Sequence, residues 1–150
     1  MIEKAIYNIL KNDTNLMNLR IYFGTLPQVS TNDNGNDEPY IVFFRNGTIP
    51  NDSKTGNAIG VINNKSGRST LDEATIQCNI FARDAEQVST FSQQVRDALD
   101  RVSGTFNGVV VQSIQFTNEI TMFEFNDTYN TKGLYQISQY YSCRVEPVYL

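Results

Sequence analysis

The chain has 150 residues, a formal net charge of −4 and no histidine. This length suits one domain that buries its own core without a metal or a disulfide. An acidic chain is poorly suited to coating nucleic acid, because binding phosphates requires clustered Lys and Arg. No apolar run approaches the roughly 18 residues that a membrane span needs. The start, MIEKAIYNILKND, lacks the basic and apolar regions of a signal peptide.

Apolar residues recur at helical spacing near the start of the chain and predict an amphipathic helix over residues 2–11. We expect a short second helical turn after it, capped by Thr14 or Asn15. The sequence RIYF at residues 20–23 predicts a short extended piece that ends at Gly24.

Residues 29–39, VSTNDNGNDEP, form an acidic polar stretch whose Asp33, Asp37 and Glu38 suggest a calcium site. An EF-hand loop has a ligand where this stretch has glycine, and it ends in a glutamate that is missing here. We therefore interpret the stretch as a solvated loop.

The apolar run PYIVFFR at residues 39–45 predicts a central strand that is covered on both faces. A connection rich in Asn, Gly and Ser follows over residues 46–73, in which AIGVI could form one arm of a hairpin. So long a connection in a small domain is usually functional or mobile. Lys54, Lys65 and Arg68 make it the one basic feature of an acidic chain. We expect it to be mobile in the free protein and ordered by assembly, through an acidic patch of a neighbouring copy in preference to DNA. The alternative is a surface insertion without a role.

The stretch from Ala74 to Leu99 predicts a half-buried strand that leads directly into a helix. Asp84 stands three residues before Gln87, as in a capping box, and marks the start of the helix. Gly104 is expected to close the helix in a left-handed conformation. An apolar stripe at steps of three and four predicts the face that packs on the sheet: Val88, Phe91, Val95, Leu99 and Val102.

Asn107-Gly108 within the sequence FNGV predicts a tight hairpin. Strands are expected over residues 109–116, 120–125 and 134–145, with a polar turn at 127–133. These elements predict an α+β fold: a mostly antiparallel sheet of four to five strands, with the N-terminal helix and one long helix packed on it, plus a long loop or hairpin insertion.

Neighbouring residues of a strand face opposite sides, so one of Tyr140 and Tyr141 should be core and the other exposed or in contact with a partner. Tyrosine is favoured at protein interfaces because it offers area with a polar tip. Tyr140 is thus a candidate contact residue.

The chain offers little for catalysis. Without histidine it lacks the commonest general base and metal ligand, and neither a phosphate-binding loop nor a zinc-ligand pattern is present. Cys78 and Cys143 lie on apolar phases of predicted strands and are interpreted as buried thiols of a reducing cytoplasm. The acidic pairs Asp72-Glu73 and Glu119 with Glu124 could serve carboxylate-based hydrolysis, but solvated surface roles are favoured. We expect no enzyme activity, no cofactor and no metal.

Taken in order, the segments of this chain resemble the bacteriophage tail completion family, also called tail terminators. The resemblance lies in the order and spacing of MIEKAIYNILKNDTNLMNL, RIYFGTLPQ, PYIVFFR, ATIQCNIFARDAEQVSTFSQQVRDALD, SGTFNGVVVQSIQF and GLYQISQYYSCRVEP. It covers nearly the whole chain as one domain, residues 1–150. The loops at 29–38 and 46–72 look longer than is usual in the family.

The resemblance implies a structural virion protein at the junction of tail and neck, assembled in the host cytoplasm. Such a subunit forms a homo-oligomeric ring, usually a hexamer, that caps the tail tube and stops its polymerisation. Its partners would be the major tail tube protein and a head completion or connector protein, with DNA passing through unbound and no membrane involved. Candidate subunit or channel contacts are Lys54, Lys65, Arg68 and Tyr140. The alternatives are another head–tail connector or tail tube protein, or a carboxylate-based hydrolase.

Overall fold

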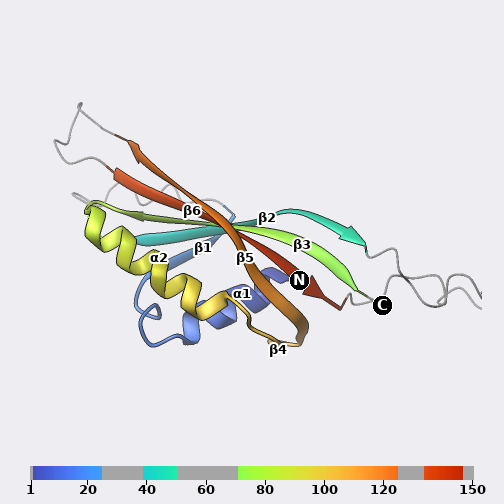
Figure 1. The fold of residues 1–150 in the computed structure, drawn as a ribbon. Helices are drawn as coiled ribbons and strands as arrows, with labels where there is room; N and C mark the ends of the chain where they lie inside the picture. The colour runs from blue at the N-terminus through green and yellow to red at the C-terminus, as the bar shows by residue number, and fades with distance from the viewer. Residues whose placement is uncertain (1, 25–38, 51–70, 125–133, 147–150) are drawn as a thin grey trace, which may run out of the picture.

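A computed structural model describes residues 2–24, 39–50, 71–124 and 134–146 of the chain (Figure 1). Two helices and six strands are found in these residues. In chain order they are α1 (Ile2–Asn12), β1 (Arg20–Phe23), β2 (Tyr40–Pro50), β3 (Asp72–Ala82), α2 (Ala85–Leu99), β4 (Gly104–Phe106), β5 (Val109–Glu124) and β6 (Leu134–Val145). The acidic stretch at 29–38, the AIGVI hairpin and the turn at 127–133 lie outside the described residues.

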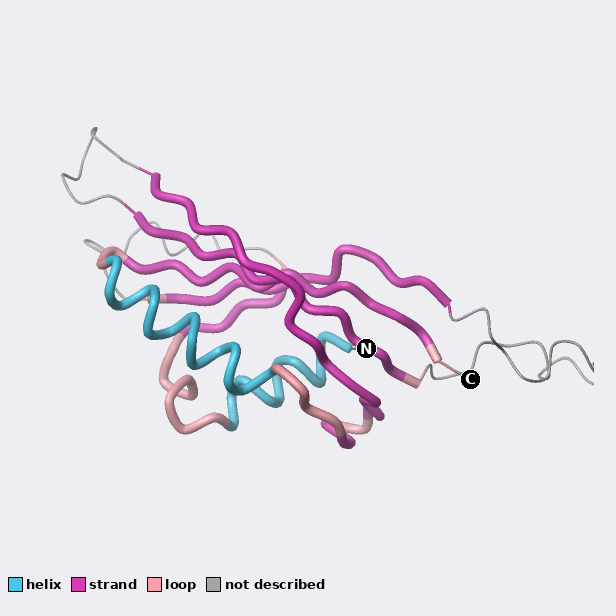
Figure 2. Tube along the Cα trace, viewed as in Figure 1, coloured by secondary structure: helices cyan, strands magenta, loops and turns pink. Residues whose placement is uncertain are grey.

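The six strands form one sheet in the order β1-β2-β3-β6-β5-β4. β1 and β2 pair in parallel, whereas all other neighbours are antiparallel. Both helices lie on the same face of this twisted sheet (Figures 1 and 2). Helix α1 contacts β1 at one end of the strand order and β4 and β5 at the other, because the sheet curves around it as a half-barrel.

The sheet is larger than the four to five strands expected from the sequence. The short piece at residues 20–23 joins it by pairing residue for residue with Tyr40–Phe43 of β2. The three residues of β4 add the sixth strand through their hairpin with β5. The fold is therefore a mixed sheet with two helices, richer in strand than predicted.

Helix α1 buries one face, as its apolar spacing predicts. Ile2, Ala5, Ile6 and Leu10 are all buried. The turn that follows is organised by Asp13, whose Oδ1 accepts a hydrogen bond of 2.9 Å from the backbone N–H of Asn15. The capping residue is thus Asp13, and not Thr14 or Asn15.

Strand β3 alternates between the two faces of the sheet. Its even-numbered residues are buried beneath the helices: Ala74, Ile76, Cys78, Ile80 and Ala82. In β6 the same face carries Ile137, Gln139, Tyr141, Cys143 and Val145. The core of the described residues therefore lies between this inner face and the two helices.

Helix α2 starts where the sequence predicts. Asp84 is its N-cap, and the Asp84 carboxylate accepts a hydrogen bond from the N–H of Glu86. The helix ends at Leu99, and the left-handed residue after it is Arg101, with φ of 65°. Gly104 is instead the first residue of β4, so its expected role as the helix cap is wrong.

The apolar stripe of α2 is slightly rotated from the prediction. Val88, Val95 and Leu99 are buried, but Phe91 is only half-buried and packs at the margin of the core. Ser92 takes the central position, because its backbone carbonyl meets the side chain of Gln139 beneath the helix.

The hairpin at Asn107-Gly108 is confirmed, with φ of 51° and 80° at its two central residues. Such positive values at both positions are those of a type I′ turn. The strands expected at 109–116 and 120–125 are one continuous strand, β5. Residues 117–119 do not interrupt it, since a register shift between Phe116 and Asn118 absorbs the irregularity as a bulge.

Strand β2 is central, between β1 and β3, and buries Ile41 and Phe43 on the inner face. On its outer face Val42 is buried and Phe44 is half-buried, although both helices lie on the other side (Figure 1). The first part of β2 is therefore largely buried on both faces, as predicted, but its outer face is covered by neither helix. β2 also continues to Pro50, and β3 begins at Asp72, so both ends of the connection expected over 46–73 are strand.

Neither helix of the described residues is long and apolar enough to cross a membrane.

Candidate functional site

The outer face of the sheet points away from both helices, and no described helix covers it (Figure 2), although Val42 and Ser138 are buried there. Its centre carries uncharged polar side chains from β3 and β6: Thr75, Gln77, Asn79, Gln136, Ser138, Tyr140 and Ser142. Several of them bond to one another, as in the 3.0 Å hydrogen bond from Gln77 Nε2 to Asn79 Oδ1. This face can therefore form hydrogen bonds with a partner but carries little charge.

Charge on the outer face is found at one end. There the Arg144 guanidinium lies 3.5 Å from the Glu73 carboxylate, and both side chains are exposed. Ile120 and Met122 project from β5 toward the other end and are 47% and 46% exposed. The outer face thus carries an ion pair beside the exposed Ile49 at one end, a neutral polar centre, and an apolar margin at the other end.

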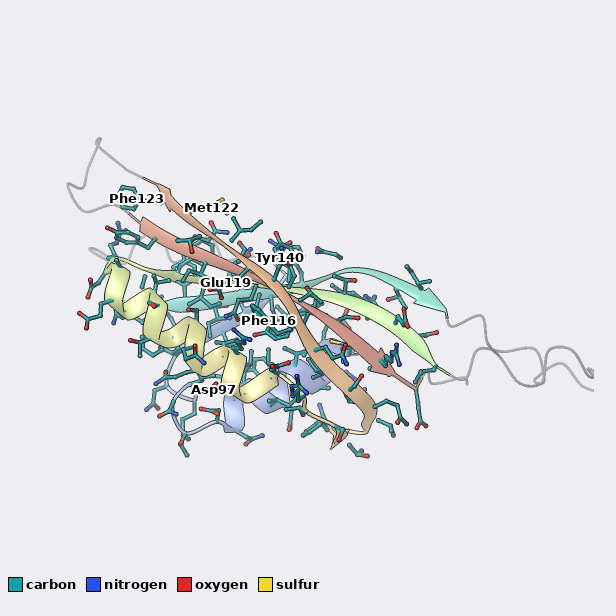
Figure 3. The ribbon with its side chains drawn as sticks, in the orientation of Figure 1. Asp97, Phe116, Glu119, Met122, Phe123 and Tyr140 are labelled. Carbon is teal, nitrogen blue, oxygen red and sulfur yellow. The ribbon has the colours of Figure 1, made fainter. Side chains whose placement is uncertain are left out.

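Tyr140 lies at the centre of this face, half-buried between Gln77 of β3 and Asn118 of β5 (Figure 3). Its backbone carbonyl accepts a 2.9 Å hydrogen bond from Thr117 Oγ1. Tyr141 faces the opposite side and is fully buried. The expected division of this tyrosine pair is confirmed. Whether Tyr140 contacts another subunit stays a prediction.

The other three candidate contacts, Lys54, Lys65 and Arg68, lie outside the described residues.

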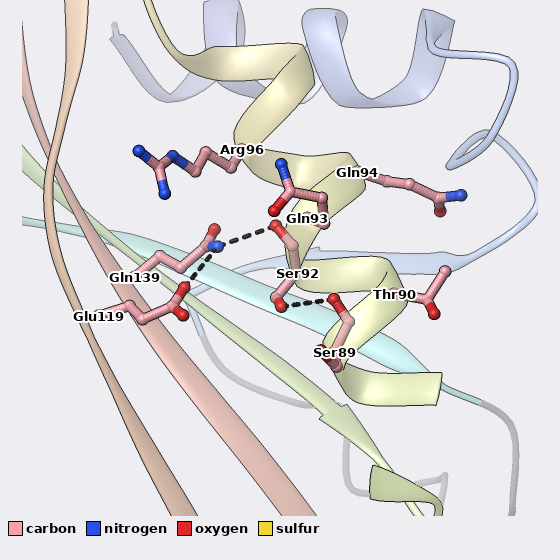
Figure 4. A pocket seen from close by; sticks show the side chains of 8 residues that line it. All are labelled: Ser89, Thr90, Ser92, Gln93, Gln94, Arg96, Glu119 and Gln139. Atoms are coloured by element: carbon pink, nitrogen blue, oxygen red, sulfur yellow. Dashed lines mark hydrogen bonds between the residues drawn. The ribbon is translucent and has the colours of Figure 1, made fainter. Parts of the chain in front are cut away.

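A polar pocket of about 500 Å³ opens on the inner face, between α2 and strands β5 and β6 (Figure 4). It is lined by Ser89, Thr90, Ser92, Gln93, Gln94, Arg96, Glu119 and Gln139. The Arg96 guanidinium lies over the ring of Phe116, 4.0 Å from its centroid. The pocket offers amides, hydroxyls, one carboxylate and one guanidinium, which suit hydrogen bonding to a polar group.

Gln139 lies at the base of this pocket and bonds to residues of α2 and of β5. Its Nε2 donates to the carbonyl of Ser92 at 2.9 Å and to Glu119 Oε1 at 3.1 Å. Its Oε1 accepts from the hydroxyl of Tyr141 at 2.8 Å. The amide is fully buried, and each of its polar atoms has a partner. The network therefore ties α2 to the sheet.

Tyr141, Cys78 and Cys143 are held neutral beneath the helices by their burial. Burial, together with the nearby Cys78 and Asp100, raises the pKa of Tyr141 above its usual range. Burial likewise raises the pKa of Cys143 to about 12 and that of Cys78 further still. Both cysteines are free and buried, as the sequence predicts. Thiols in this state are poor nucleophiles, because the thiolate is the reactive form.

In the first acidic pair, Asp72 and Glu73 are neighbours in β3 and face opposite sides of the sheet, with Glu73 beside Arg144. In the second, Glu119 is bonded to Gln139 on the inner face, and the side chain of Glu124 lies outside the described residues. Within the residues described, no three acidic, cysteine or histidine side chains are placed to hold a metal ion. The described part of the chain offers surfaces and a polar recess, and its buried thiols have no base placed beside them.

The roles of Gln139, Ser92 and Glu119 were missed in the sequence. The signal was present in β6, where Gln139 interrupts an otherwise apolar phase that runs from Ile137 through Tyr141 to Val145. A polar residue on a buried phase requires a partner, and here the partner comes from a helix 47 residues away in the chain.

The chain was compared with family models, curated protein sequences and solved structures. No family model and no curated protein sequence match the chain. A match is found among the solved structures. A chain of the virion of a native gene transfer agent (GTA) particle has the same fold with a TM-score of 0.65. The match covers 95% of this chain and 92% of that one, at 14% sequence identity. Because it extends over nearly the full length of both chains, the fold is shared as a whole.

Proposed function

We propose that this protein is a structural component of a virion: a tail terminator subunit that forms a ring on the end of the tail tube. The ring stops polymerisation of the tube and offers the surface on which the head connector docks. The observation that carries the proposal is the fold shared along almost the whole chain with a component of a GTA virion. The resemblance of the ordered sequence segments to tail terminators supports the finer assignment.

The chemistry of the described surfaces agrees with a structural role. Buried thiols and dispersed carboxylates are features of a scaffold, and the polar outer face can meet a partner through hydrogen bonds. A neutral polar face is also suited to face DNA that passes without being held, because retention of DNA requires clustered cations. In this proposal the ring is a homo-oligomer, most simply a hexamer, in the tail–neck junction of the virion.

Electron microscopy tests the proposal against its nearest alternative. The purified chain at high concentration should form single rings, whereas a tail tube protein would stack into long tubes. Added to a polymerising tube protein encoded in the same genome, the chain should shorten the tubes and be found at one end of each. Long stacks of the chain alone would favour a tube subunit. Tubes of unchanged length without end-bound rings would overturn the terminator assignment.

A further inference from the structure

One half of β5 has a free edge. The strand pairs with β6 along most of its length, but with β4 only at Val109–Val111. The segment after α2 covers the next part: Arg101 N–H donates to the Ile114 carbonyl at 2.6 Å, and Asp100 Oδ1 accepts from the N–H of Phe116 at 3.0 Å. Beyond Phe116 no described strand pairs with this side of β5.

The free half of β5, residues 117–122, is exposed at every position. Ile120 and Met122 present apolar side chains there, next to Phe123 at 50% exposure (Figure 3). Glu119 is its one charged side chain. Soluble proteins usually protect such edges with lysine, proline or a covering element, because an open apolar edge pairs with other strands. An unprotected edge of this length is therefore typical of a surface that a partner strand covers.

Strand β1 forms the edge at the other end of the sheet. Its last residue, Phe23, is 56% exposed, and Tyr7 of α1 beside it is 43% exposed. These two residues line a hollow of about 360 Å³ with Glu3, Lys4 and Asn107. No described strand pairs with the other side of β1, and the exposed Phe23 and Tyr7 give this edge an apolar surface on the inner face.

Lysines lie near the β1 edge, whereas the free half of β5 carries one carboxylate, Glu119, which lines a pocket with Arg96. Near β1, Lys4 is exposed in the hollow, and the Nζ of Lys11 in α1 lies 3.3 Å from the carbonyl of Leu19, just before the strand. Glu3 in the same hollow is already paired with Arg45 at 3.4 Å. Contact between the β1 edge and the β5 edge therefore brings Glu119 toward lysines. Contact between two β5 edges would instead bring two Glu119 carboxylates into one interface.

We propose that the free half of β5 adds, edge to edge, to β1 of a second copy of this chain. Ile120 and Met122 then lie beside Tyr22 of the neighbour on the outer face. Contact between two different edges is heterologous, so each copy still offers one edge to the next, and the series closes into a ring if the rotation permits. The inference rests on the proposed ring and specifies which surfaces build it.

Cysteine cross-linking between two variants tests the pairing. Tyr22→Cys is mixed in turn with Asn118→Cys, Ile120→Cys or Met122→Cys, all on the outer face, and treated with a short bis-maleimide. At least one of these mixtures should give a covalent dimer in high yield. Thr121→Cys is the matched control: it lies on the inner face of the same strand and should cross-link to Tyr22→Cys several-fold less. The native thiols stay silent because both are buried.

Each variant alone is the second control. Ile120→Cys without Tyr22→Cys should stay uncross-linked, since β5 edges do not meet in the proposed contact. Dimers of Ile120→Cys alone would replace the proposal with pairing of two β5 edges. Equal yields for Thr121→Cys, or no cross-link in any mixture, would overturn it.

A charge placed on the edge gives an independent measurement. Ile120→Lys should abolish self-association in sedimentation velocity at concentrations where the natural chain associates, because a lysine on the free edge blocks strand addition. Gln112→Lys adds the same charge earlier in β5, where Gln112 Nε2 contacts Glu146 Oε2 at 2.7 Å. This control should associate normally and melt at the same temperature. If Ile120→Lys is folded and associates as well as the control, the edge is not the contact.

The outcomes separate this inference from the proposed function. Rings that form and cap tubes without any cross-link from Tyr22 to β5 would leave the terminator role in place and remove the edge contact. Cross-linked open chains without rings would retain the edge contact and remove the ring.

Discussion

The side-chain amide of Gln139 in β6 donates a hydrogen bond of 2.9 Å to the backbone carbonyl of Ser92 in α2. A mid-helix carbonyl is ordinarily satisfied within its own helix, so this second bond fixes the helix over one strand. The same amide accepts from the hydroxyl of Tyr141. The side chain of Gln139 therefore holds α2 in position and also provides the hydrogen-bond acceptor for the buried hydroxyl of Tyr141.

We expect Gln139→Leu to lower the free energy of unfolding by about 1–3 kcal/mol. The substitution preserves volume but leaves the hydroxyl of Tyr141 buried without its acceptor. Urea denaturation followed by circular dichroism measures the change. Gln115→Leu, at an exposed position of β5, is the control and should change stability little. Equal effects at the two positions would show that the network adds nothing beyond packing.

The apolar stripe of α2 predicts that two truncations will lower stability by different amounts. Leu99→Ala should cost about 2–5 kcal/mol, because Leu99 is fully buried and its removal leaves a cavity. Phe91→Ala should cost less than Leu99→Ala, since Phe91 is only half-buried at the margin of the core. Thermal or urea unfolding of the two variants decides. A greater loss for Phe91→Ala would mean that this ring is a core residue after all.

The N-cap of α2 is expected to make its own contribution to the free energy of unfolding. Asp84→Ala removes the acceptor of the Glu86 N–H and should cost about 0.5–2 kcal/mol. Thr90→Ala, an exposed position within the same helix, controls for helix propensity and should be neutral or slightly stabilising. A neutral Asp84→Ala would show that water replaces the cap without loss.

The buried thiols predict a pH dependence at the alkaline end. In the unfolded chain a thiol titrates near its ordinary pKa of 9.0, whereas burial raises the pKa of Cys143 to about 12 in the folded protein. Alkali therefore removes protons from the unfolded state first, and stability should fall progressively from about pH 9 upward. Cys143→Ala should show a shallower fall above pH 9 than the natural chain, although it is less stable at pH 7. Parallel curves for the two proteins would contradict the assignment.

The same burial predicts that both thiols are silent in the folded state. A thiol-reactive dye at pH 8 should label the protein only as fast as it unfolds, and labelling should become rapid in denaturing urea. Fast labelling of one cysteine in the native protein would place that residue at the surface.

Local patterns predicted much of this fold. The alternation in β3, the Asp84 cap and the Asn107-Gly108 turn each depend on neighbours in the sequence, and each is found in the structure. Two local predictions failed, since Gly104 does not cap α2 and Asp13 takes the place of Thr14 or Asn15. The other failures depend on distant pairing. The parallel addition of β1 to β2 and the continuity of β5 across its bulge come from interstrand bonds that no local pattern encodes.

The features of the candidate site also differ in whether the sequence could predict them. Opposite faces for Tyr140 and Tyr141 followed from strand geometry alone. The network of Gln139 could not be assigned in advance, because its partners Ser92 and Glu119 come from two other elements. The free edge of β5 was also hidden, since only the strand pairing shows that β4 accompanies β5 no further than Val111.

Tyr140 tests whether the centre of the outer face is a subunit contact. Its side chain is half-buried between polar neighbours, so truncation removes an aromatic surface that is typical of interfaces without emptying the core. If a neighbouring subunit covers it, Tyr140→Ala should raise the concentration needed for ring formation about tenfold, which corresponds to roughly 1.4 kcal/mol of contact energy. Sedimentation velocity over a dilution series measures the shift, and the circular dichroism spectrum checks that the fold is kept. Ser142→Ala, two residues along the same face, is the matched control and should associate as the natural chain does. If Tyr140→Ala and Ser142→Ala form rings at the same concentration, Tyr140 is no subunit contact, and its place on the outer face then fits the lining of a channel instead.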